Sequence, residues 1–192
     1  GNMGEDLLFC PRGGAIYVWD YSSPYARGLL ISSLPGAAEV PEEALVILVA
    51  DQDRRAIALG APAYGEVVLD PMMIRWSSDG DYLNWDPTDT AATSGGRQLD
   101  DGREIICGLV GSREILVWTD TALYTMQHNY TRTVFNIERV GAADIAGPMA
   151  MANLNETVYW MGTNSFFRYN GRISRVPCTI QDHVFSDMNV SQ

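Results

Sequence analysis

The chain has 192 residues, a formal net charge of −11 and an isoelectric point near 4.4. This acidity argues against a free-standing nucleic-acid reader, because such proteins gain affinity by neutralising phosphates with Lys and Arg. With 46% hydrophobic residues the chain can bury a core, but no apolar run is long enough to cross a bilayer, so no membrane partner is expected.

Short runs of Val, Ile, Tyr and Trp, punctuated by Gly, Asp, Asn and Pro, predict β-strands along the whole chain. No window of a dozen residues sustains the apolar period of a helix, so helix is expected only as short turns at 41–44 and 181–185. The strand-rich segments form four blade-like units within a single domain that spans residues 1–192. The units are predicted near residues 5–35, 40–75, 98–130 and 134–175.

One hairpin-like pattern returns along the chain. Residues 115–124 form an apolar run, a small polar turn and a second run with an aromatic, and residues 158–167 repeat this order. Trp118 and Trp160 lie 42 residues apart, and weaker echoes occur at 7–19 and 46–59. Four-stranded sheets repeated around an axis have such a period. The sequence therefore predicts an all-β fold, either a β-propeller or a partial (open) β-propeller built from roughly 40-residue blades.

The units are unevenly spaced, and the excess lies at residues 76–97, which are rich in Ser, Asp, Thr, Gly and Pro. We expect a long inserted loop, and such loops in compact domains are usually functional or interfacial. Its two tryptophans are expected to pack the loop back onto its blade. A full extra blade with degenerate strands is the alternative. The candidate residues for a protein interface are Trp76, Asp79, Asp81, Tyr82, Trp85 and Asp86.

Four units are at the low end of closed propellers, and the last unit lacks outer strands in the sequence pattern. An unclosed propeller exposes sheet edges and part of its core. We therefore expect either a fragment of a longer protein or an open piece that a partner completes.

Candidate chemistry is sparse. The three cysteines, Cys10, Cys107 and Cys178, form no C-x-x-C pair, which indicates free thiols and neither a zinc nor a redox motif. His128 is expected to be a solvated turn residue. No nucleophile signature or phosphate-binding loop occurs. No catalytic, cofactor-binding or metal-binding residue is predicted, and no cofactor.

Two chemical alternatives stay open. Four carboxylates at strand turns, Asp20, Asp51, Asp53 and Asp120, could line one rim, and two of them, such as Asp51 and Asp120, could act there as the acid–base pair of a glycan hydrolase. Hydrogen bonding within the turns explains these acids more simply. The loop acids could also supply oxygen ligands to Ca²⁺, although they lack the EF-hand spacing. These loop acids are Asp79, Asp81, Asp86 and Asp89.

Several blocks occur in a fairly specific order over roughly residues 67–189. They are Ile74–Ser77, Asn84–Pro87, Leu99–Gly108, Val117–Met126, Phe135–Gly141, Val158–Gly162, Phe166–Gly171 and His183–Phe185. In this order the chain resembles the tail accessory proteins of short-tailed phages, described as packaged-DNA stabilisation or tail-nozzle proteins.

The resemblance implies a propeller-bearing virion structural protein, not an enzyme, in the tail nozzle or head-to-tail channel through which DNA is retained and ejected. Its implied partners are other tail or connector subunits, copies of itself in an oligomeric ring, and double-stranded DNA that passes without specific binding. An acidic inner surface would let that DNA slide past. Its implied location is the virion, assembled in the bacterial host cytoplasm. The alternatives are a glycan hydrolase or glycan-binding module of the tail, and an interaction module like the WD-repeat proteins, whose signature is not repeated here.

Overall fold

The computed structural model describes residues 1–23, 26–50, 52–129 and 134–187, and these fold almost entirely as β-strands. In the described residues, sixteen strands form four antiparallel sheets of four strands each. Within every sheet the strands lie side by side in chain order, so each sheet is a simple meander. The all-β prediction is confirmed. No helix of the described residues is long and apolar enough to span a membrane.

Sheets 1 and 2 come from the first half of the chain. Sheet 1 contains β1 (Asn2–Met3), β2 (Asp6–Phe9), β3 (Tyr17–Trp19) and β4 (Leu29–Leu30), followed by the short 3₁₀ helix η1 (Ile31–Ser33). Sheet 2 contains β5 (Val46–Ala50), β6 (Arg55–Pro62), β7 (Leu69–Trp76) and β8 (Gly95–Gln98). The strands of sheet 1 are the shortest, so this sheet contributes the least apolar surface of its own.

Sheets 3 and 4 come from the second half. Sheet 3 contains β9 (Ile105–Val110), β10 (Ile115–Thr119), β11 (Ala122–His128) and β12 (Phe135–Ala142). Sheet 4 contains β13 (Met151–Leu154), β14 (Thr157–Met161), β15 (Phe166–Tyr169) and β16 (Ile173–Val176), and the helix α1 (Gln181–Ser186) follows it. This helix matches the predicted turn at 181–185, whereas the turn predicted at 41–44 is wrong, because Ala44 instead bridges to Gly14 in an extended link.

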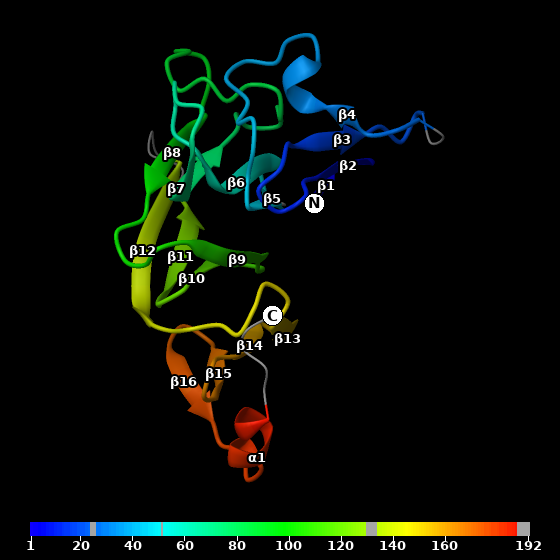
Figure 1. Cartoon of the computed structure of the whole chain (residues 1–192). Coiled ribbons are helices and arrows are strands. Elements are labelled where there is room, and N and C mark those ends of the chain that lie inside the picture. The colour runs from blue at the N-terminus through cyan, green and yellow to red at the C-terminus, as the bar shows by residue number, and fades with distance from the viewer. Residues whose placement is uncertain (24–25, 51, 130–133, 188–192) are drawn as a thin grey trace.

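The four sheets follow one another through the molecule (Figure 1). The first strands β5, β9 and β13 lie toward one side, and the last strands β8, β12 and β16 lie toward the opposite side. Strand β5 contacts both β2 and β9, so consecutive sheets touch near their first strands. Gly108 of β9 permits this approach, because a Cβ there would lie 2.6 Å from the side chain of Leu59 and 2.8 Å from that of Leu48.

Three apolar cores fill the spaces between consecutive sheets. Side chains alternate between the two faces of a strand, so the inner sheets must be apolar on both faces. In β10, Ile115 and Val117 enter the core shared with sheet 2, whereas Leu116 and Trp118 enter the core shared with sheet 4. This explains the continuous apolar runs in the middle of the chain.

Trp118 and Trp160 do not occupy equivalent positions. Trp118 pairs with Leu123 beside the β10–β11 turn, and the corresponding pair beside the β14–β15 turn is Met161 with Phe166. Trp160 is therefore offset by one residue, which places it on the opposite face of its sheet. The two indole rings meet edge to face in the core between sheets 3 and 4, and their centroids lie 5.6 Å apart. Trp118 and Trp160 therefore contact each other and are not equivalent positions of two repeated units.

The four sheets also begin and end at residues that differ from the boundaries predicted for the four units. The predicted unit 40–75 omits β8, which pairs with β7 after a long loop. The predicted unit 98–130 omits β12, which pairs with β11 although the prediction gave it to the following unit. In both cases the displaced strand is the outermost one of its sheet, because a local pattern does not show which sheet a strand joins.

A side chain of sheet 1 reaches sheet 3 on the side of the first strands. Arg12, in the link between β2 and β3, donates to the carbonyls of Ile106 and Ile105 at 2.8 and 3.2 Å and lies 3.7 Å from a carboxylate oxygen of Glu104. A hollow of about 370 Å³ on this side is lined by residues of all four sheets, among them Leu8, Val46, Cys107 and Met151. The sheets therefore converge on this side.

Candidate contact surface

The predicted interface loop connects β7 to β8 over residues 77–94. Its expected boundaries are too wide at both ends, because Trp76 closes β7 and Gly95 opens β8. Its described residues form isolated bridges only, Ala38 with Asn84 and Ser78 with Asp81. An extra blade hidden in this segment, the alternative reading, is therefore wrong.

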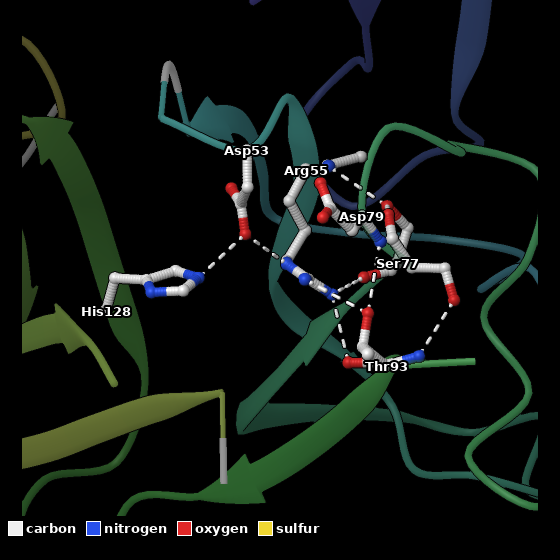
Figure 2. Close-up of polar contacts among 8 residues, drawn as sticks. Asp53, Arg55, Ser77, Asp79, Thr93 and His128 are labelled. Atoms are coloured by element: carbon white, nitrogen blue, oxygen red, sulfur yellow. Dashed lines mark hydrogen bonds and ion pairs between the residues drawn. The ribbon is translucent and has the colours of Figure 1, made fainter. Parts of the chain in front are cut away.

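Arg55 of β6 ties both ends of this loop to sheet 2 (Figure 2). Its guanidinium donates to the carbonyl of Ser77 at the start of the loop and to the carbonyl of Thr93 at its end, the latter at 2.9 Å. A further bond of 3.1 Å reaches the Thr93 hydroxyl, which also accepts the amide of Asp79. The residue is only 2% exposed, so these carbonyls replace the water that a cation otherwise needs.

Asp53 balances this buried charge and extends the network to sheet 3. Its Oδ2 lies 2.8 Å from Arg55 Nε and 3.1 Å from His128 Nε2 (Figure 2). The side chains of Asp53 and His128 are 11% and 18% exposed, so the expectation that His128 is a solvated turn residue is wrong. The His128 ring also packs edge to face on Phe135. A cavity of about 90 Å³ adjoins the pair and is lined by the β5–β6 and β9–β10 turns.

A second arginine fixes the middle of the loop. Arg75 is 4% exposed and donates to the carbonyls of Trp85 and Glu39 at 2.9 and 2.8 Å. Burial lowers the pKa of its guanidinium from the ordinary value. Trp85 is completely buried in the core between sheets 1 and 2, and its indole N–H donates to the carbonyl of Tyr82 at 2.8 Å. The loop therefore completes a core that the short strands of sheet 1 cannot fill.

The loop acids serve as turn formers. Asp81, Asp86 and Asp89 each accept the backbone amide two residues further along the chain, a local bond typical of Asp in turns. The hydroxyl and amide of Thr88 hold the pKa of Asp86 below its usual value. Nowhere in the described ranges do three or more His, Cys, Asp or Glu side chains gather as metal ligands would. The geometry gives the Ca²⁺ alternative no support.

The six candidate interface residues separate into three groups. Trp76 and Trp85 are buried, Trp76 against the ring of Phe135 at 5.3 Å, so neither presents a contact surface. Tyr82 and Asp86 are half-buried, and Asp79 and Asp81 are exposed. A partner that approaches this loop would meet acidic and polar turns around residues 79–81 and 87–91 and no aromatic anchor.

The two acids proposed for a hydrolase rim do not form a described pair. Asp51 lies outside the described residues. Its neighbour Asp53 lies beside the β9–β10 turn, whereas Asp120 lies beyond the other end of β10 and accepts the amide of Arg103. Asp20, a third rim acid, accepts the amide of Ser22 in its own turn. The acids for which the geometry is described are thus engaged in turns or ion pairs.

Acidic residues concentrate in the turns at the ends of the sheets. The first strands β1, β5, β9 and β13 carry no charged residue at all. Asp6, Asp70 and Glu138 are the acids found within strands of the described chain. The hollow where the sheets converge is lined by residues of β5, β9 and β13, and these strands contribute no acid to it.

The sequence pattern placed Asp53 only among the turn carboxylates and did not single out Arg55, although a signal was present. Four charged residues, Asp51, Asp53, Arg54 and Arg55, stand between the apolar runs of β5 and β6, and a charge that is buried beside such runs is tolerated only if it is paired. The comparisons with known proteins add no assignment: no protein-family model matches the chain, and the search of curated proteins returned no match.

Proposed function

We propose that this chain is a structural protein of a phage virion, a component of the tail nozzle or head-to-tail channel, and that its four sheets are part of a β-propeller. The observation that carries the propeller is the Arg12 contact. Stacked sheets lie about 10 Å apart, so in a straight stack sheet 1 would stand about 20 Å from sheet 3. An arginine side chain is too short to cross that distance. The hydrogen bonds from Arg12 to the carbonyls of Ile105 and Ile106 therefore support an arrangement in which the sheets bend toward one another on the side of their first strands.

The charge distribution supports a role beside DNA without specific binding. The turns at the sheet ends carry most of the acids, and two arginines, Arg55 and Arg75, are buried inside the protein. Arg12, Arg113 and Arg139 are each paired with a carboxylate at the surface. Acidic residues outnumber Lys and Arg by 24 to 13, and this negative net charge favours repulsion of DNA over its retention. The resemblance to tail accessory proteins points to the same role.

The decisive experiment is to purify virions from a culture that carries the gene and to quantify the chain by mass spectrometry. The proposal expects the chain in the particles at a fixed multiple of a known tail subunit, and expects heads that lose packaged DNA when the gene is deleted. Absence of the chain from purified particles, or unchanged DNA retention after deletion, would contradict the proposal.

A binding assay separates the electrostatic part of this proposal from the assembly part. Fluorescence anisotropy of a labelled duplex at 20 mM salt should show no binding by the native chain. Replacing the exposed acids Asp79, Asp81 and Asp89 by Lys should raise the affinity measurably, whereas replacement of the exposed Val67 by Ala should not. Tight duplex binding by the native chain would exclude passage without adhesion.

A further inference from the structure

The outward face of sheet 1 is apolar and uncovered. Residues of β2 and β3 alternate, so Leu8 and Val18 enter the core with sheet 2 while their neighbours point away from it. On the outward face Leu7 and Phe9 are 40% and 39% exposed, and the rings of Phe9 and Tyr17 stack at 5.6 Å. The face consists of Leu7, Phe9, Tyr17, Trp19 and Leu30, with Asn2 at its β1 edge.

A sheet face that meets water normally carries polar residues in alternation with the buried ones. Sheet 1 departs from this rule, because Leu7, Phe9, Tyr17 and Trp19 stand where polar side chains would. Its pattern matches that of β10, which is covered by a sheet on each face. The residues of sheet 1 therefore suit a second sheet packed on this face. Exposed apolar patches of this kind mark interaction sites.

Sheet 4 presents a related face at the other end of the molecule. Val158 and Trp160 enter the core with sheet 3, and the alternate residues point outward. Of these, Tyr159 is 37% exposed and Leu154 is 61% exposed. Phe185 of α1 covers Phe166 at one corner of the face, with 5.2 Å between the rings. The apolar side chains of the outward face are Ala152, Leu154, Tyr159, Met161, Phe166 and Val176, and its polar side chains are Thr157, Arg168 and Ser174.

We propose that two copies of this chain associate head to tail, with the outward face of sheet 1 in one copy packed on the outward face of sheet 4 in the next. Each contact would repeat the sheet-on-sheet packing that occurs three times within the chain. This inference goes beyond the proposed function and rests on it only for the closure of such contacts into a ring. Heterologous contacts of this kind produce rings when the rotation closes.

Charge favours this pairing over the association of two identical faces. Sheet 1 is flanked by the acids Glu5 and Asp20 and by the base Arg27, so its flanks keep a net negative charge and two copies of its face would repel each other. Sheet 4 has exposed arginines, Arg168 on the face and Arg172 in the β15–β16 turn. Asp20 lies in the β3–β4 turn, which corresponds in its sheet to the β15–β16 turn.

The chain already contains an ion pair of this kind. Arg113 in the β9–β10 turn and Glu156 in the β13–β14 turn, corresponding turns of adjacent sheets, lie 3.3 Å apart. By the same geometry Arg172 of one copy meets Asp20 of the next. The proposed contact thus combines an apolar centre with an ion pair at its rim, as protein interfaces do.

The test measures mass by light scattering on the purified full chain across a range of concentrations. The native chain should form dimers or larger species. Phe9→Arg and Tyr159→Arg should each yield monomers, and Leu7→Arg and Leu154→Arg repeat the test should either first variant unfold by circular dichroism. Val67→Arg places the same charge on an exposed residue outside both faces and should leave the mass unchanged.

Mixing distinguishes head-to-tail contact from other arrangements. Phe9→Arg and Tyr159→Arg copies each retain one intact face, so an equal mixture should recover a heterodimer that neither forms alone. Arg172→Glu should weaken association at least tenfold. A native chain that stays monomeric, or a mixture that stays monomeric while the native chain associates, would overturn the proposal. None of these results depends on whether the chain occurs in virions, so the two proposals fail separately.

Discussion

Arg55 is the residue on which the long loop depends. Its guanidinium is almost wholly buried and bonds to Asp53, to Ser77 at one end of the loop and to Thr93 at the other. A buried ion pair adds little net stability compared with apolar residues, but removal of one partner leaves the other uncompensated. The network therefore fixes the course of the chain more than it strengthens the fold.

We predict that Arg55→Met lowers the free energy of unfolding by about 3–5 kcal/mol, because the Asp53 charge and two carbonyls lose their partner. Urea denaturation measures this loss. Arg113→Met is the matched control, since its ion pair with Glu156 is largely exposed and its loss should cost less than about 1 kcal/mol. Equal losses in the two variants would mean that Arg55 does not hold the loop.

Cys107 makes stability sensitive to alkaline pH. The thiol is 2% exposed between sheets 3 and 4, and burial raises its pKa from 9.0 to about 12. Between these values the unfolded chain releases a proton that the folded chain retains, so stability is full below pH 9 and falls as pH rises toward 12. The loss from this group is about 1.4 kcal/mol per pH unit.

Denaturation at pH 8.5, 9.5 and 10.5 tests this prediction. Cys107→Ala should give a shallower decline than the native chain, whatever its stability at pH 8.5. Thr90→Ala, which removes no titratable group from an exposed site, should keep the native slope. Parallel declines in the native chain and Cys107→Ala would show that this thiol does not titrate differently on folding.

At the scale of elements, the β7–β8 loop acts as part of the fold. The strands of sheet 1 have two to four residues, and Trp85 supplies a fully buried ring to the core that this sheet shares with sheet 2. The sequence predicted the loop and its anchoring tryptophans. It also placed Trp85 among the candidate interface residues, and burial of the whole ring indicates a role in folding instead.

We expect Trp85→Ala to destabilise the chain by about 3–5 kcal/mol, because it opens a large cavity and frees the carbonyl of Tyr82. Thermal and urea unfolding measure the effect. Thr90→Ala changes an exposed residue of the same loop and should stay within about 0.5 kcal/mol of the native chain. A stable Trp85→Ala variant with altered self-association would restore the interface interpretation.

The sequence was informative where the pattern is local. The hairpins at 115–124 and 158–167 appear as predicted, because alternating apolar residues and short turns specify them within a few residues. Strand β8, with the sequence GGRQ, has little strand propensity and is recognisable only by its pairing with β7. The Asp53–His128 pair joins residues 75 apart in the chain, which no local pattern shows.

At the scale of the whole molecule, the four sheets differ in how many of their faces are covered by a neighbouring sheet. Sheets 2 and 3 have a neighbour on each face, and sheets 1 and 4 have one neighbour and one outward apolar face. The turns around them carry most of the acids, and the first strands are uncharged. We propose that the protein functions through contacts between sheets, both within one copy and between copies.

Native-state hydrogen exchange tests this arrangement most directly. We predict that the amides of β6, β7, β10 and β11 exchange last, because both faces of their sheets are covered, and that those of β2, β3, β14 and β15 exchange sooner. The measurement should use a concentration at which the chain is monomeric, or the Phe9→Arg variant. Slower exchange in sheet 1 or sheet 4 than in sheets 2 and 3 would contradict the serial arrangement of the four sheets.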